Sequence, residues 1–330
     1  MRFVKFTLVS AFCLTATLVH AAGFRIIAVP AEAGRPMIRA AVWSPCLEQV
    51  GEVKLRGITL AATENCAVSG EKLSLVVISH GYRGSFTGHH DTAEALADGG
   101  FVVVALNHPV DSGGGDMSRA DTLEALTERP ADIKRVIDYM LTEWSDRAKV
   151  DRENIGFFGF SRGGYTGLVV AGGNPDLRKA IAFCPEGSPK PICAQLRRNE
   201  LPTEPFVHDE RVKAVVVADP AFGPMFDPDD LKNVKIAFQL WESELSGEDQ
   251  TGGEVTPDYV STIVRDLPVK PDYHLVRGAG HYAFLTPCAP ELAKRVPMIC
   301  TDRPGFDRVA FHTEFNAAVL AFFRKHFGKD

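Results

Sequence analysis

Residues 154–164 constrain the fold more than any other part of the sequence. An apolar run, residues 155–160, contains Gly159 and is followed by Ser161 and Gly163. Small residues with helical spacing come after them. A strand that bends sharply into a helix needs glycines beside the bend, because side chains there would collide with neighbouring backbone. The pattern therefore predicts a buried strand, a tight turn that presents the Ser161 hydroxyl, and a helix packed behind it.

Short apolar runs rich in Val, Ile and Phe alternate with amphipathic segments along most of the chain. The alternation predicts an α/β fold, a mostly parallel central sheet with helices on both faces. The expected strands are residues 24–29, 37–43, 73–79, 101–106, 155–160, 212–218, 235–240 and 273–276. The expected helices are residues 90–97, 120–144, 163–171, 257–267 and 311–327. No helical segment separates the first two runs, so we expect them to form an antiparallel edge of the sheet.

Residues 1–21 have the composition of a secretory signal peptide. The basic residues Arg2 and Lys5 precede an apolar stretch, residues 6–19, and small residues follow it. That stretch is shorter than the roughly 20 apolar residues that a spanning helix needs. We therefore expect cleavage before Ala22, export to the periplasm or the medium, and no membrane span in the mature chain.

The cysteines predict a disulfide framework. Apart from Cys13 in the leader, six cysteines remain, and an even number is typical of an exported, disulfide-bonded chain. Short loops are the easiest to close, so neighbours are expected to pair. The predicted pairs are Cys46 with Cys66, Cys184 with Cys193, and Cys288 with Cys300. A zinc site is the alternative, but the sequence has neither a C-x-x-C knuckle nor an H-E-x-x-H helix.

The net charge and the chain length limit the possible functions and the possible number of domains. The formal charge is −6 and no Lys/Arg cluster is present, which argues against a nucleic-acid surface and favours neutral or lipid-like substrates. Residues 22–330 are expected to form one large α/β domain. Within it, residues 172–211 are rich in Pro, Arg and Glu, and we interpret them as an excursion above the sheet, a candidate lid.

A second motif lies at the end of the apolar run over residues 73–79. That run continues into His80, Gly81 and Tyr82, the position of the loop that stabilises an oxyanion in hydrolases built around such a serine turn. One amide donor comes from this loop and one from the residue after the nucleophile, so the expected donors are the backbone N–H groups of Tyr82 and Arg162. His80 is expected to brace the loop by hydrogen bonding.

His281 is the predicted general base. Among the ten histidines it is the one that follows the last expected strand, in a Gly-rich turn before the terminal helix. That is where the chain order Ser, acid, His requires the base. We interpret the others as surface or packing residues: His89, His90, His108, His208, His274, His312 and His326.

The acid that orients this imidazole is less clear from the sequence. It belongs at the carboxyl end of a strand between the serine and the histidine. Glu244, our first choice, follows the later of two suitable strands together with Glu242, whereas Asp219 ends the earlier one. Asp249 is a distant third, and each of these could instead be a solvated loop carboxylate.

With these motifs in place, the chain from Leu73 onward resembles the bacterial dienelactone-hydrolase-related and platelet-activating-factor-acetylhydrolase-like branch of the α/β-hydrolases. The resemblance is carried by residues 79–82, by residues 159–164, and by residues 278–281 with Phe284. It implies the α/β-hydrolase fold, and two departures limit what else it implies.

The first departure is the nucleophile, because dienelactone hydrolases proper use a cysteine where this sequence has Ser161. Opening of dienelactone rings is therefore not implied. The second concerns the acid. The acetylhydrolases place it after the earlier strand, which maps to Asp219, and the dienelactone hydrolases place it after the later one, near Glu244.

Together these features predict a serine hydrolase that cleaves carboxylic esters with short-chain or lipid-like acyl groups through an acyl-enzyme intermediate. The chemistry needs no metal or organic cofactor. A peptidase or amidase of the same fold is one alternative, although such enzymes usually carry a large extra domain for which this chain has no room. A non-catalytic binding protein of this fold is another, but it would normally lack the serine or the histidine.

Overall fold

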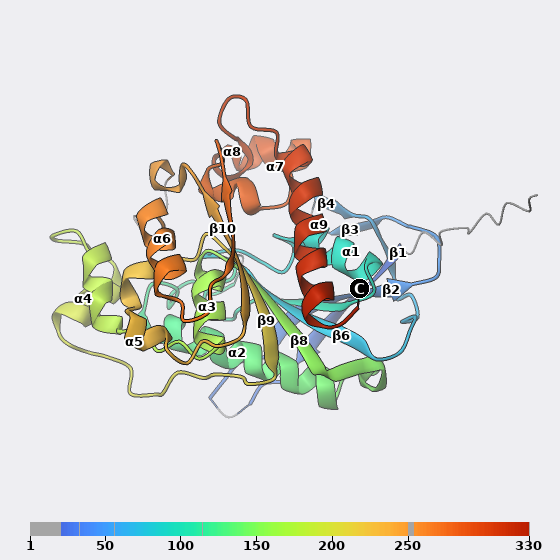
Figure 1. Cartoon of the computed structure of the whole chain (residues 1–330), viewed down its shortest axis with the longest axis horizontal. Coiled ribbons are helices and arrows are strands. Elements are labelled where there is room, and N and C mark those ends of the chain that lie inside the picture. Colours follow the sequence, from blue (N-terminus) through green and yellow to red (C-terminus); the bar gives the residue numbers. More distant parts are fainter. Residues whose placement is uncertain (1–20, 33, 56, 114, 250–253, 330) are drawn as a thin grey trace, which may run out of the picture.

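A twisted nine-stranded sheet forms the centre of the molecule (Figure 1). The computed structural model describes residues 21–32, 34–55, 57–113, 115–249 and 254–329. The predicted signal peptide lies outside these residues except for Ala21, which begins the first strand. In the described part of the chain, no helix is long and apolar enough to span a bilayer.

Six strands of the sheet run parallel. In spatial order they are β11 (Asp272–Val276), β10 (Ala237–Ser243), β9 (Val212–Ala218), β8 (Val150–Phe160), β6 (Leu73–Ser79) and β7 (Val102–Leu106). The sheet continues beyond β7 with antiparallel β2 (Ile38–Cys46) and β1 (Ala21–Val29), and then with the short β5 (Ala62–Glu64). A separate hairpin pairs β3 (Val53–Leu55) with β4 (Ile58–Leu60). The predicted parallel sheet with an antiparallel N-terminal edge is therefore confirmed.

Helices cover both faces of the sheet. On one face lie α2 (Leu123–Thr142), α3 (Arg162–Val170) and α6 (Pro257–Asp266), and on the other lie α1 (His90–Asp98) and α9 (Arg308–His326). Figure 1 shows α1 and α9 together on one side, with α3 and α6 on the other. The short helices are α4 (Pro191–Arg197), α5 (Pro228–Leu231), α7 (Pro290–Arg295) and α8 (Pro297–Cys300). The 3-10 turns are η1 (Arg147–Lys149), η2 (Leu177–Phe183), η3 (Gly223–Met225), η4 (Ser246–Glu248) and η5 (His281–Phe284).

The central strands are apolar throughout because both of their faces are covered. All residues of β6 and β7 are buried. Alternate side chains of a strand point to opposite faces, so Leu75 and Val77 of β6 join the cluster under α2 and α3, whereas Val76 and Ile78 join the cluster under α1 and α9. Each such side chain stabilises the fold by about 1.5–3 kcal/mol, which is why the sheet holds the ends of its strands in fixed positions.

Strand β10 extends beyond its predicted end. The apolar run suggested residues 235–240, but the strand extends to Ser243. Trp241 and the two polar residues after it stay in the sheet because β11 pairs with them, Glu242 opposite Leu275 and Ser243 opposite Val276. Hydropathy alone underestimates the length of a strand when its last residues pair with a segment that is distant in the sequence.

Three disulfides are formed, and they join the neighbour pairs expected from the sequence. Cys46 at the end of β2 is bonded to Cys66, Cys184 after η2 is bonded to Cys193 in α4, and Cys288 is bonded to Cys300 in α8. Cross-links of this kind typically stabilise a fold by about 2–4 kcal/mol.

Candidate active site

Ser161 occupies a strained turn between β8 and α3. Its backbone has φ 56° and ψ −118°, in a region that residues other than glycine rarely adopt and that costs about 1–3 kcal/mol. A Cβ atom at Gly159 would overlap the Gly163 carbonyl, and one at Gly163 would overlap the Ser79 carbonyl. The backbones of β6, β8 and α3 thus approach so closely that glycine is required, as the sequence pattern predicts.

The end of strand β9 lies directly beside this turn. The Ser161 N–H donates to the Ala218 carbonyl at 2.9 Å, and the Ala221 N–H donates to the Ser161 carbonyl at 3.0 Å. Residue 219 is therefore held next to the serine by main-chain bonds on either side of it.

Asp219 and His281 form a buried hydrogen-bonded pair. His281 Nδ1 lies 3.0 Å from Asp219 Oδ2, and both residues are almost completely buried. The same carboxylate also accepts hydrogen bonds from the Ser243 N–H at 2.7 Å and from the Ser243 hydroxyl. Since the carboxylate faces Nδ1 as an acceptor, we assign the imidazole proton to Nδ1, which leaves Nε2 with its lone pair. An imidazole in this tautomer can accept a proton at Nε2.

The structure reverses the expected ranking of the acid candidates. Glu244, the first choice, accepts the Gly278 N–H at 2.8 Å and contacts Arg277 at 3.2 Å, so its carboxylate is directed away from the imidazole. Asp249, the third choice, accepts the backbone N–H of His281 and holds the loop rather than the ring.

The reason is the order of the strands. Strand β9 lies between β8 and β10, so the carboxyl end of β9 is adjacent to the serine and the end of β10 is one strand farther away. Glu242, which the sequence placed beyond the strand, lies within β10, and its carboxylate accepts from the Tyr273 hydroxyl at 2.8 Å.

A ring contact places the imidazole against Phe160, the residue before the serine. The Phe160 ring stacks on His281 with centroids 4.6 Å apart and an interplanar angle of 29°. In the part of the chain that the structure describes, no hydrogen bond links the Ser161 hydroxyl to the imidazole. Such bonds are often long before substrate binds and shorten in the complex.

Two backbone amides face the same region. A Cβ atom at Gly81 would lie 3.1 Å from Ser161 Cβ, which places the loop containing Tyr82 directly against the serine. The Arg162 N–H is the first of helix α3. Among the described residues, neither the Tyr82 nor the Arg162 amide has a hydrogen-bonding partner, an arrangement typical of an oxyanion hole.

His80 braces the loop, as the sequence suggested. Its Nδ1 lies 2.6 Å from the Gly81 carbonyl, and its Nε2 lies 3.2 Å from the His108 N–H. Burial lowers the pKa of His80 to about 4, so the ring is neutral near pH 7 and accepts the His108 N–H at Nε2.

Sequence reasoning missed the buried Arg129 beneath this loop. Its guanidinium binds both Asp111 oxygens, at 2.6 and 2.8 Å, and donates to the Ser79 hydroxyl at 3.1 Å and to the His80 carbonyl. Its Nε donates to Thr166 of α3 at 3.1 Å. The sequence does contain a signal for this residue. Arg129 interrupts the apolar face of the expected helix over residues 120–144, and a charged residue at such a position needs a buried partner.

A second missed group supports the loop that carries His281. His312 on α9 lies 2.6 Å from Asp91 Oδ2 through Nδ1 and 2.9 Å from the Ala283 carbonyl through Nε2. Both partners are acceptors, so each ring nitrogen is placed to donate a hydrogen bond. His89 adds a contact of 3.2 Å to the Phe284 carbonyl. These histidines pack in the core, as expected, but they also bind the backbone of η5.

Comparison with known proteins agrees with this architecture. Residues 60–219, from the end of β4 to Asp219, match the model of the Dienelactone hydrolase family. The matched segment contains the turn at Ser161 and ends at Asp219. The predicted resemblance to the dienelactone-hydrolase-related group is thereby confirmed.

Two solved α/β-hydrolase structures cover nearly all of the chain. A ferulic acid esterase from Streptomyces cinnamoneus superposes with a TM-score of 0.61 at 19% identity, covering 94% of this chain and 91% of that one. A dienelactone hydrolase from Anabaena variabilis ATCC 29413 gives 0.51 at 15% identity, covering 92% and 98%. At these identities the similarity establishes the shared fold.

Curated relatives match a shorter segment. Cutinase est1 of Thermobifida alba is 31% identical over 112 residues, which are 33% of this chain and 34% of the relative. The cutinase of Thermobifida fusca (strain YX) is 30% identical over the same length, 33% of this chain and 32% of the relative. The chain thus matches about a third of the length of these relatives.

Proposed function

We propose that this protein is a serine hydrolase of the α/β-hydrolase type that cleaves carboxylic esters through an acyl-enzyme intermediate. Ser161 is the nucleophile, His281 the general base and Asp219 the acid of the triad. The observation that carries the proposal is the Asp219–His281 hydrogen bond of 3.0 Å, formed directly beside the strained turn at Ser161. In the described structure no hydrogen bond occupies His281 Nε2, which supports its role as the proton acceptor.

In the acylation half of the reaction, Nε2 of His281 takes the Ser161 proton as Oγ attacks the carbonyl carbon. The carbonyl oxygen becomes an oxyanion that accepts hydrogen bonds from the Tyr82 and Arg162 amides. Asp219 stays ionised and stabilises the imidazolium. The imidazolium then gives its proton to the leaving alcohol oxygen, and the carbon–oxygen bond to that group breaks.

In the deacylation half, a water molecule attacks the acyl-Ser161 ester and transfers a proton to His281 Nε2. A second oxyanion forms in the same place and collapses to release the carboxylic acid. The proton returns from the imidazolium to Ser161 Oγ, which restores the resting enzyme.

The proposed substrates are esters with short-chain or lipid-like acyl groups. The curated relatives are named as cutinases and one structural neighbour as a ferulic acid esterase, which supports ester hydrolysis over amide hydrolysis for this chain. We further propose that the chain is exported, since its three disulfides suit an oxidising compartment. Residues 172–211, which contain η2 and α4, are proposed to act as a lid on the described sheet.

The decisive experiment replaces the nucleophile. Ser161→Ala is expected to lower kcat on p-nitrophenyl esters of graded acyl length by about 10⁴-fold or more, because no other group can form the acyl-enzyme. A fluorophosphonate probe should label the wild-type protein and not the variant. Ser246→Ala is a matched control, since Ser246 is buried and its hydroxyl has no hydrogen-bonding partner in the described structure. Full activity in Ser161→Ala would refute the proposal.

A further inference from the structure

The side chains of the two proposed oxyanion residues are linked to each other, a feature that the role of their backbone amides does not require. The Arg162 guanidinium lies 4.1 Å from the centroid of the Tyr82 ring. The Tyr82 hydroxyl donates to Asp121 Oδ2 at 2.9 Å, and Arg162 Nη2 lies 3.3 Å from Asp121 Oδ1. One carboxylate therefore holds both side chains.

The Arg162 guanidinium is buried and fully occupied by protein groups. Its Nε and Nη2 bind the two oxygens of Glu254 at 3.0 and 2.8 Å, and its Nη1 donates to the Ala120 carbonyl at 2.8 Å. Burial alone would lower the pKa of Arg162, but Glu254, Asp111 and Asp121 raise it. A desolvated guanidinium with this many fixed acceptors has a single orientation, because any rotation leaves a buried charge unpaired.

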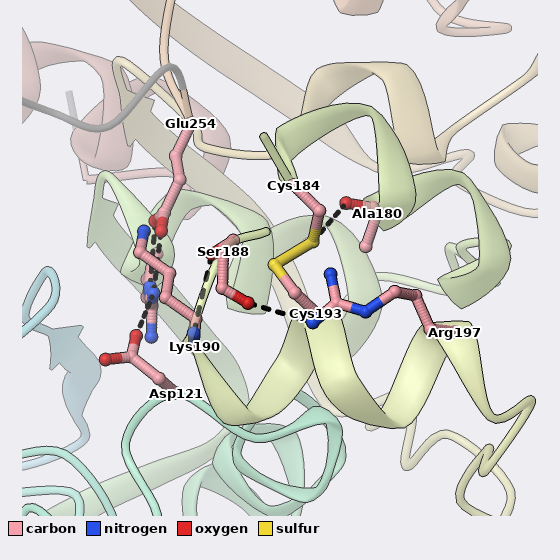
Figure 2. The surroundings of a disulfide bond; sticks show 9 residues. Asp121, Ala180, Cys184, Ser188, Lys190, Cys193, Arg197 and Glu254 are labelled. Atoms are coloured by element: carbon pink, nitrogen blue, oxygen red, sulfur yellow. Dashed lines mark hydrogen bonds and ion pairs between the residues drawn. A yellow bond between two sulfur atoms is a disulfide. The ribbon is translucent and has the colours of Figure 1, made fainter. Parts of the chain in front are cut away.

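Asp121 also contacts the disulfide-bonded segment that contains α4. The Ile192 N–H at the start of α4 donates to the Asp121 carbonyl at 2.6 Å, and the Leu123 N–H donates to Gln195 of α4 at 2.9 Å. Figure 2 shows the Asp121 and Glu254 carboxylates on either side of the Arg162 guanidinium, to which both are bonded. Helix α4 thus binds the main chain of Asp121, whereas Arg162 and Tyr82 bind its carboxylate.

We propose that Arg162, Asp121 and Glu254 form a clamp that positions the amides of Tyr82 and Arg162 for oxyanion binding. The inference rests on the proposed ester hydrolysis and assigns side-chain roles to residues that the reaction itself uses only through their backbone or not at all. Tyr82 lies on a loop and is 37% exposed, so its amide needs a constraint beyond the loop's own bonds. Displacing a catalytic donor by about 1 Å can cost on the order of 10²-fold in rate.

The test uses two conservative variants. Tyr82→Phe removes the hydroxyl bonded to Asp121 but keeps the ring on Arg162, and Asp121→Asn removes the charge but keeps the volume. Each is expected to lower kcat about 10-fold and to change KM less than twofold, since the oxyanion exists only after attack. The double variant is expected to lose no more than either single one, because both changes break the same link.

A trifluoromethyl ketone provides a readout that a merely structural role would not change. It adds to the serine hydroxyl and forms a stable oxyanion, so its inhibition constant should rise about 10-fold in each variant while KM stays constant. Tyr165→Phe is the matched control, because the Tyr165 hydroxyl on α3 is buried without a partner in the described structure, and we expect wild-type values for it.

The possible results distinguish a failure of the clamp proposal from a failure of the proposed hydrolysis. Wild-type kcat and ketone affinity in both clamp variants, with Ser161→Ala inactive, would overturn the clamp and leave the proposed hydrolysis standing. Activity in Ser161→Ala would instead overturn the hydrolysis itself. If Asp121→Asn fails to fold, the Tyr82→Phe result decides, since that change leaves every charge in place.

Discussion

At the scale of single residues, the candidate site depends on which carboxylate faces the imidazole. Asp219 has a positive φ of 42° and accepts three hydrogen bonds, from His281 Nδ1 and from the backbone and hydroxyl of Ser243. A carboxylate with several donors is held in one orientation. Glu244 lacks this environment, as its contacts are with Gly278 and the exposed Arg277.

Isosteric amides should therefore separate these two acids. Asp219→Asn is expected to lower kcat by about 10⁴-fold, because an amide facing Nδ1 favours the wrong imidazole tautomer. Glu244→Gln should stay within a few-fold of wild type. Ester turnover measured on both purified variants checks the assignment, and a larger loss in Glu244→Gln than in Asp219→Asn would contradict it.

At the scale of secondary-structure elements, α1 and α9 hold the turn that carries His281. Asp91 of α1 binds His312 and Asn316 of α9, and His312 in turn donates to the Ala283 carbonyl. The Thr286 hydroxyl also donates to Asp91. Two helices far apart in sequence thus fix the backbone just after the general base.

Replacing His312 tests this support. His312→Gln is expected to reduce the free energy of unfolding by about 1–3 kcal/mol, because Gln cannot reach both partners of the ring, the Asp91 carboxylate and the Ala283 carbonyl. Turnover should also fall, since the η5 turn is held less firmly. Urea unfolding and ester kinetics measure the two effects. His326→Gln, at the C-terminus of the same helix, is the control, and equal values for both variants would argue against the assignment.

At the scale of the whole molecule, burial couples folding to pH through two histidines near the oxyanion loop. Burial lowers the pKa of His80 to about 4 and that of His89 to about 3, compared with 6.5 when unfolded. Between these values the unfolded chain binds more protons than the native one. The stability contributed by the neutral rings is therefore complete above pH 6.5 and is lost as the pH falls toward 4 and below.

Unfolding should accordingly take up close to two additional protons near pH 5 because of these rings. We expect the urea midpoint to fall between pH 7 and pH 5, and His80→Gln to make this fall smaller by removing one titrating group. His208→Gln, at an exposed histidine that contacts the Gly173 carbonyl, is the control. A pH dependence that is unchanged in His80→Gln would show that other groups govern acid unfolding.

Local patterns were sufficient for much of this molecule. The strand–turn–helix unit at Ser161 could be predicted because the requirement for glycine depends on backbone atoms within a few residues. The main strands and helices followed from periodicities of 2 and 3.6 residues, and the short-range cysteine pairs from the low entropy cost of closing small loops.

Only the tertiary structure decided the partners of these local units. Asp219 lies beside the imidazole because β9 pairs with β8, and the order of strands in a sheet is set by packing between distant segments. The extension of β10 to Ser243 and the links of Arg162 to Asp121 and Glu254 arise in the same way. Contacts between residues far apart in the chain leave little trace in the local pattern around either one, which is why the local pattern favours Glu244 whereas the order of the strands favours Asp219.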